Sequence, residues 1–149
     1  MAGAYSYEQA LQVIRKLDLP MQSIEQQFRR MVFNIIARNQ DDHVKNIAFL
    51  MDKSGNWSLS LAFDMTYSYN PAGSWTSSHQ MTLNNKRDDF TLDDFKACAK
   101  VVSMKRGRAE AIVKEVQKVV SRWQNYAEGV RVPVAWRDKI HRTLYLETF

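Results

Sequence analysis

Three side chains in the first half of the sequence could carry out phosphoryl transfer to a hydroxyl group. Asp41 and Asn46 lie five positions apart, and Asp64 follows after a stretch with the pattern of two short strands. In this chemistry an aspartate accepts the proton of the attacking hydroxyl, while an asparagine and a second aspartate hold the metal ions that bridge the ATP phosphates. The order and spacing therefore predict Asp41 as the catalytic base, and Asn46 and Asp64 as ligands of Mg²⁺.

A simpler interpretation exists for this acidic segment when it is taken alone. Short turns rich in Asp and Asn are common, and their side chains often do no more than accept hydrogen bonds from nearby backbone amides. The full combination is more specific, because a helical pattern ends just before Asp41 and a predicted hairpin separates Asn46 from Asp64. The strands of a hairpin bring their outer ends together, so we expect Asp64 to return close to Asn46.

The residues before the acidic segment have the apolar pattern of two amphipathic helices. Apolar side chains recur at three- and four-residue spacings over residues 7–19 and again over residues 21–38. Ser6 is a typical N-cap for the first helix, and Pro20 marks its end. The second helix would end immediately before Asp41, so that a packed core could aim an otherwise mobile loop.

Residues 47–61 have the pattern of a β-hairpin. An apolar run over residues 47–51 and an alternating run over residues 57–61 flank turn-forming residues at 52–56. Residues 67–87 follow without a sustained period, but they contain many large aromatic side chains. This composition favours an ordered loop over a flexible linker.

The last third of the sequence is predicted to be helical. Thr91 followed by Asp94 is a helix-start pattern, and a wide apolar stripe runs over residues 112–127 as far as Gly129. Pro133 is compatible with the first turn of a final helix. We therefore expect a mainly α fold with one short β-hairpin.

Size and composition fit one compact domain over residues 1–149. With 45% hydrophobic and 25% charged residues, the chain can bury a core of ordinary size. Neither a membrane-spanning run nor a signal peptide is evident, so the cytoplasm is the expected location and no membrane partner is expected. The single cysteine, Cys98, is expected to be buried and unreactive. The tryptophans fall mostly on apolar patterns and are expected mainly in the core: Trp57, Trp75, Trp123 and Trp136.

The net charge of +5 is concentrated near the carboxyl terminus. Residues 96–149 carry 12 basic and 5 acidic side chains, whereas residues 1–95 carry 9 and 11. Lys105, Arg106 and Arg108 form the densest cluster. They could contact a polyanion such as nucleic acid. The simpler interpretation, which we favour at this point, is a solvated helix face.

Three stretches of the sequence resemble a known family. Asn39–Leu50, Leu61–Met65 and His79–Lys86 are similar to the carboxyl-terminal domain of HipA-type toxin kinases, serine/threonine kinases of bacterial toxin–antitoxin systems. The resemblance covers nearly the whole chain and implies the helical C-terminal lobe of a protein-kinase-like fold. It gives the aspartates and the asparagine of the spacing argument the same roles, as catalytic base and magnesium ligands.

The resemblance leaves the roles of two intervening side chains open. His43 could brace the loop by hydrogen bonding, and Lys45 could approach a phosphate of ATP. Both side chains could equally be structural. They are the candidate cofactor-binding residues of the chain.

The sequence departs from that family at its amino-terminal end. The family carries a preceding lobe with an ATP-cradling loop and a phosphate-binding lysine, whereas only forty residues precede Asp41. We expect the ATP-binding lobe to be absent and the chain alone to be inactive. Either the sequence is a truncated piece of a longer protein, or a separate polypeptide supplies the lobe. The five glycines form no phosphate-binding pattern: Gly3, Gly55, Gly73, Gly107 and Gly129.

Two functions follow from these observations. The first is the catalytic-loop and magnesium-binding portion of a kinase that phosphorylates a protein substrate. The alternative is a kinase remnant without activity, whose basic carboxyl-terminal region contacts an antitoxin protein or operator DNA.

Overall fold

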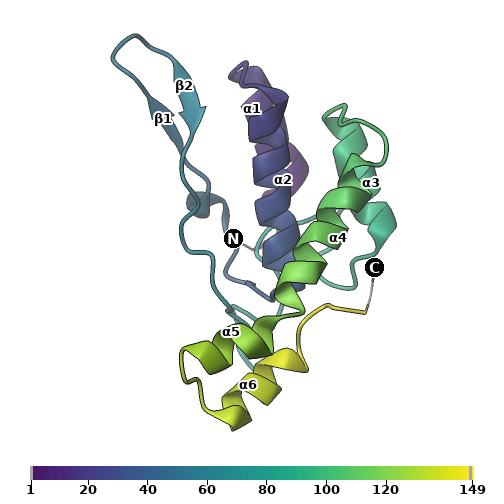
Figure 1. Cartoon of the computed structure of the whole chain (residues 1–149). Coiled ribbons are helices and arrows are strands. Elements are labelled where there is room, and N and C mark those ends of the chain that lie inside the picture. Colours follow the sequence, from purple (N-terminus) through teal and green to yellow (C-terminus); the bar gives the residue numbers. More distant parts are fainter. Residues whose placement is uncertain (1, 148) are drawn as a thin grey trace.

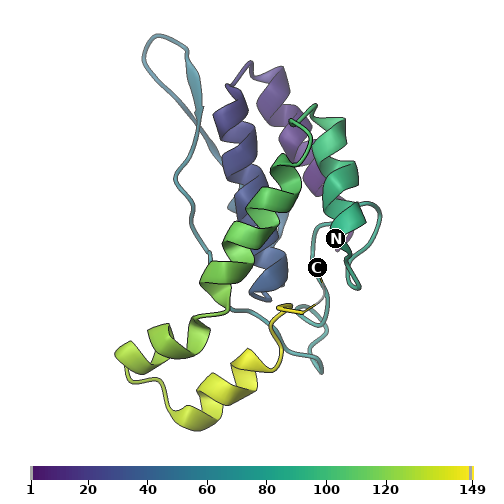
Figure 2. The same cartoon turned by 45° about the vertical axis from the view of Figure 1, so that its right-hand side comes forward.

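The computed structural model describes residues 2–147 and 149, and it is mainly helical with one small hairpin (Figure 1). This confirms the expected fold class. Helices α1 to α4 pack side by side, the hairpin stands beside α2, and α5 and α6 form a pair at the end of α4 (Figures 1 and 2). In chain order the elements are α1 (Tyr7–Lys16), α2 (Met21–Ile36), the 3₁₀ turn η1 (Val44–Asn46), β1 (Phe49–Met51), β2 (Trp57–Leu59), α3 (Leu92–Val101), α4 (Arg108–Val120), α5 (Trp123–Gly129) and α6 (Val134–His141).

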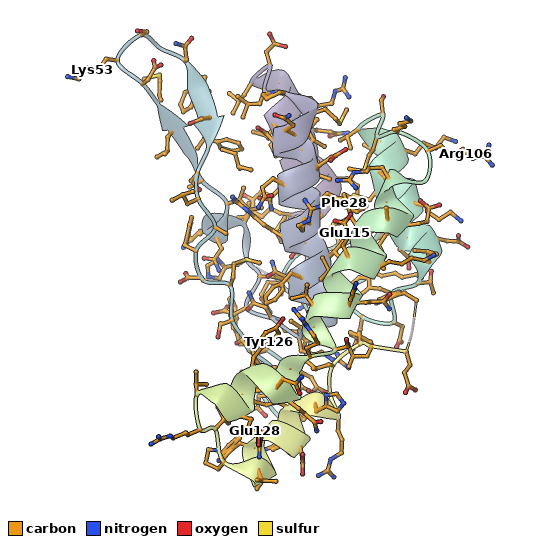
Figure 3. The ribbon with its side chains drawn as sticks, in the orientation of Figure 1. Phe28, Lys53, Arg106, Glu115, Tyr126 and Glu128 are labelled. Atoms are coloured by element: carbon orange, nitrogen blue, oxygen red, sulfur yellow. The ribbon has the colours of Figure 1, made fainter. Side chains whose placement is uncertain are left out.

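The first two helices form as the apolar pattern predicts. Ser6 caps α1 by accepting from the amide of Gln9, whose side chain accepts from the Ser6 amide in return. Helix α2 buries an apolar stripe against α1 and α4, and Phe28 lies on its α4 side (Figure 3). It ends at Ile36, two residues earlier than expected, because Arg38 has a left-handed φ of 57°.

Helix α3 has the start that its sequence indicates. The side chain of Thr91 bonds the third residue of the helix, Asp94, whose carboxylate accepts from the Thr91 amide at 2.8 Å. The single thiol, Cys98, is fully buried on this helix, as expected. Burial raises the pKa of the Cys98 thiol because the thiolate would lose its hydration.

The long carboxyl-terminal apolar stripe is divided between two helices rather than one. Helix α4 ends at Val120, where the amide of Arg122 bonds the Val119 carbonyl in a tighter three-residue turn. The chain then changes direction, and α5 packs against α6. The indole Nε1 of Trp123 donates to the Arg137 carbonyl of α6 at 3.2 Å, which a straight continuation of α4 would not allow.

The hairpin is shorter than its sequence pattern, and its turn end projects away from the helices (Figure 1). Phe49 pairs with Leu59 and Met51 with Trp57, while Lys53 marks the tip (Figure 3). Trp57 is exposed here, as are Trp75 in the following loop and Trp136 on α6. The expectation that the tryptophans lie mainly in the core is therefore wrong. Across the described residues, no helix has the length and apolar character needed to cross a membrane.

Candidate active site

The chain leaves α2 in a left-handed turn and pairs at once with the segment that follows Asp64. The amide of Gln40 donates to the Ser68 carbonyl at 2.9 Å, and the amide of Ser68 donates to the Arg38 carbonyl at 3.0 Å. These bonds hold the acidic segment against the chain that returns from the hairpin. The two sequence segments of the candidate site are thus joined by backbone hydrogen bonds.

Asp41, the candidate catalytic base, lies at the surface with an accessible carboxylate. Its side chain is 43% exposed, and the Nε2 atom of His43 lies 3.9 Å from its Oδ1. The indole Nε1 of Trp75 donates to the same oxygen at 2.6 Å. An accessible carboxylate is what a general base must offer to an incoming hydroxyl group.

Asn46 and Asp64, the candidate magnesium ligands, line the same small cavity. The Asn46 amide nitrogen donates to the Asp41 carbonyl at 3.2 Å, which leaves its amide oxygen available as a ligand. Asp64 has a left-handed φ of 51°, and its carbonyl accepts from the buried Asn39 side chain at 2.9 Å. The same Asn39 nitrogen also donates to Asn34 of α2 at 2.9 Å, so a core helix fixes the backbone of Asp64.

Asn46 and Asp64 offer too few ligands for a metal ion coordinated only by protein side chains, but they suit Mg²⁺, which needs few protein ligands. No group of three or more His, Cys, Asp or Glu side chains that could hold a metal occurs within residues 2–147 and 149. Asn46 and Asp64 instead offer one amide oxygen and one carboxylate beside a shared cavity. Magnesium commonly binds in this way, through one or two protein oxygens with water and substrate phosphates completing the shell.

Asp42 serves as a buried structural anchor next to the candidate base. Its carboxylate accepts from the Tyr7 hydroxyl at 2.6 Å and from the Gln80 amide at 2.7 Å, and it lies 2.7 Å from His79 Nδ1. Burial, reinforced by the adjacent Asp42 carboxylate, raises the pKa of Tyr7 well above its ordinary value. Sequence reasoning missed this anchor, although His79 and Gln80 open the third stretch that carries the family resemblance.

The two candidate cofactor-binding residues lie beside the base. His43 and Lys45 line a surface cavity of about 270 Å³ together with Trp75 and Tyr5. The Nδ1 atom of His43 is buried without a hydrogen-bond partner among the described residues. His43 lies next to the candidate base, and both the phosphate-facing and the structural role remain open for the two side chains.

The basic cluster lies far along the chain, at the turn between α3 and α4. Lys105 and Arg106 are exposed, and Arg106 projects outward from this turn (Figure 3). Arg108 differs, because its guanidinium pairs with Glu25 at 2.9 Å and with Glu115 at 3.2 Å. These hydrogen bonds raise the pKa of Arg108, and the bond to Glu25 ties α4 to α2.

The chain is a mainly helical domain in which Asp41, Asn46 and Asp64 lie on two segments that backbone hydrogen bonds join. Comparison with known families agrees with this description: the HipA-like C-terminal domain profile matches residues 1–123. The chain therefore belongs to this HipA-like family, which is associated with toxin–antitoxin systems. No curated protein matches the sequence. Helix α6 and most of α5 lie beyond the matched residues.

Proposed function

We propose that the chain is the catalytic-loop and magnesium-binding portion of a HipA-like serine/threonine protein kinase. The observation that carries the proposal is the joining of the two site segments. Asn46 bonds the backbone of Asp41, while Asn39 bonds the backbone of Asp64. These two partly buried amide contacts support the proposal, because they fix the backbone of both segments beside an accessible carboxylate.

Each side chain has a distinct task in this proposal. Asp41 orients the serine or threonine hydroxyl of a protein substrate and accepts its proton. Asn46 and Asp64 would hold Mg²⁺ through their side-chain oxygens. When bound with ATP, the ion neutralises charge on the phosphates. Lys45, which lines the neighbouring surface cavity, would approach a phosphate of ATP.

The proposal includes an ATP-binding lobe supplied by another chain segment or polypeptide. Phosphoryl transfer depends on positioning and electrostatic clamping of the nucleotide. Residues 1–149 contain no glycine-rich phosphate-binding pattern. We therefore expect these residues alone to bind ATP weakly and to have little or no kinase activity.

The first experiment is calorimetric titration of magnesium and a non-hydrolysable ATP analogue into the purified chain. Asp64→Asn removes the proposed ligand charge, and Asp52→Asn in the exposed hairpin turn is the matched control. Weak or absent binding by the folded chain, restored when a HipA-type ATP-binding lobe is added, supports the proposal. Binding that Asp64→Asn leaves unchanged in the reconstituted protein would contradict it.

A second candidate function is contact with antitoxin or operator DNA through the basic cluster. Arg106 and Lys100 line a surface cavity of about 560 Å³ between α3 and α4. Each phosphate contact contributes about 0.9 to the slope of log affinity against log salt. Neutralising Lys105 and Arg106 should lower that slope by about 2, whereas Arg108→Ala should lower it less because its charge is already paired.

A further inference from the structure

We infer that Trp75 is a positioning residue for Asp41 and that it couples the loop over residues 67–87 to the catalytic base. This inference rests on the proposed function for its catalytic consequence. The contact itself is a property of the chain alone. Trp75 is outside the three stretches that carry the family resemblance.

The contact is direct and specific to one oxygen. The indole Nε1 of Trp75 donates to Oδ1 of Asp41 at 2.6 Å, although the two residues are 34 positions apart. Within the described chain, no other side chain donates a hydrogen bond to this carboxylate. Hydrogen bonds to ionised acceptors are shorter and stronger than those between neutral groups. Trp75 therefore holds Oδ1 and leaves Oδ2 for the incoming hydroxyl.

Apolar packing does not explain a tryptophan at this position. Trp75 is 49% exposed, and its ring lines the surface cavity beside His43 and Lys45 rather than the core. A buried tryptophan contributes mainly through the apolar area that it removes from water. The ring of Trp75 stays half exposed, whereas its N–H group makes the only side-chain hydrogen bond to the Asp41 carboxylate among the described residues.

The backbone of Trp75 is itself anchored to the buried network next to Asp41. The side-chain amide of Gln80 donates to the Trp75 carbonyl, and the Gln80 backbone amide donates to Asp42 Oδ1 at 2.7 Å. The loop is also closed on itself, since the Asn70 amide donates to the Thr76 carbonyl at 3.2 Å. Trp75 is thus tied to the acidic pair in two ways. Its indole donates to Asp41, and its carbonyl accepts from Gln80, whose backbone amide donates to Asp42.

This arrangement has a defined chemical consequence. A carboxylate fixed through one oxygen has fewer orientations to lose when it bonds a substrate hydroxyl, which is how precise positioning speeds a reaction. In the transfer step, the hydroxyl proton would move to Oδ2 of Asp41 while the hydroxyl oxygen bonds the γ-phosphorus of ATP. The bond from that phosphorus to the β,γ-bridging oxygen breaks, and ADP leaves. Displacement of the loop would remove the Trp75 bond and free the carboxylate to rotate.

The contact is testable on the chain as it stands. Nuclear magnetic resonance resolves the indole N–H signals of the four tryptophans, and Trp75→Phe assigns one of them. We expect Asp41→Ala to move the Trp75 signal upfield and to speed its exchange with solvent. The other three indole signals should stay in place and report an intact fold. A Trp75 signal that does not respond to Asp41→Ala would overturn the inference.

The carboxylate provides the reciprocal readout. In a sample with ¹³C-labelled aspartate, Trp75→Phe should shift the carboxyl signal of Asp41, whereas Trp57→Phe should leave it unchanged. Trp57 is the matched control, because it is similarly exposed but lies on the hairpin. A purely structural tryptophan would not act selectively on this one carboxyl group.

The catalytic consequence is measured in the protein reconstituted with an ATP-binding lobe. Trp75→Phe should lower kcat about ten- to hundredfold, with the KM for ATP unchanged. An unchanged kcat would overturn the positioning role even where the contact is present. If the unsubstituted reconstituted protein transfers no phosphate, the proposed function fails, whereas loss of the spectroscopic coupling alone refutes only this inference.

Discussion

The carboxylate of Asp42 and the imidazole of His79 lie 2.7 Å apart, and both side chains are completely buried. The pair joins the candidate catalytic loop to the segment that closes over it. The Tyr7 hydroxyl of α1 donates to the same carboxyl group, so three distant parts of the sequence meet at one side chain. The exposed candidate base, Asp41, is adjacent in sequence to this anchored carboxylate.

Asp42 should therefore matter far more for stability than Asp41. We expect Asp42→Ala to destabilise the fold by about 3–5 kcal/mol, because Tyr7, His79 and the Gln80 amide would lose their shared acceptor. Asp41→Ala, at the adjacent but exposed position, should cost less than about 1.5 kcal/mol. Urea unfolding monitored by circular dichroism measures both values. Equal losses for the two variants would contradict the assignment of Asp42 as the anchor.

A second carboxylate makes stability depend on pH in a predictable direction. Burial alone would raise the pKa of Asp94, but hydrogen bonds from Lys86, Asn84 and Thr91 outweigh it and lower the pKa to about 2. The value in an unfolded chain is 3.8, so the unfolded state takes up the proton first as the pH falls. The stabilisation is complete above about pH 4 and is lost as the pH falls towards 2.

The magnitude follows from the size of the pKa difference. The lowering of the Asp94 pKa from 3.8 to about 2 corresponds to about 2 kcal/mol of stability at neutral pH. Asp94→Asn should lower the free energy of unfolding by about this amount at pH 7, and the difference should shrink towards pH 2. Asp93→Asn, a neighbouring exposed position, is the control and should show little change. A constant effect of Asp94→Asn between pH 7 and pH 2 would refute the charge-based explanation.

Much of the fold was predictable because its signals are local. The capping pairs at Ser6 and Thr91 and the buried stripe of α2 are properties of a few adjacent residues, and each element begins as predicted. The division between α4 and α5 was not predictable, because the apolar stripe continues through it. Packing of Trp123 against α6 decides the break, and that contact depends on residues far along the chain.

The residues of the candidate site could be predicted from the sequence, but the contacts that hold them in place could not. The spacing of Asp41, Asn46 and Asp64 is visible in the sequence, and all three lie around the joined segments. The contacts made by Asp42 and Trp75 join residues more than thirty positions apart, and no hydrophobic period or local motif indicates them. An exposed aspartate and a buried one are also indistinguishable when they are adjacent in sequence.

The single thiol should be inert in the folded chain. Cys98 is fully buried and its pKa is raised by burial, so both access and thiolate formation are suppressed. We expect it to react with a thiol reagent at pH 8 at least about a hundredfold more slowly in the folded chain than in denaturant. Adding Ser54→Cys in the exposed hairpin turn supplies a fast internal reference. Equal rates for the two thiols in the folded protein would be inconsistent with this burial.

Two glycines should respond to alanine with opposite signs. Gly107 precedes α4 with φ at 81°, and a Cβ there would meet nothing within 4 Å, so the cost of Gly107→Ala is backbone strain alone. We expect a loss of about 1–2 kcal/mol. Gly129, at the end of α5, has equally open surroundings and no positive φ. Gly129→Ala should therefore be neutral or stabilise the fold by up to about 1 kcal/mol, by reducing the entropy of the unfolded chain. Thermal unfolding of the two variants tests the contrast, because neither site offers side-chain contact and only Gly107 has a positive φ.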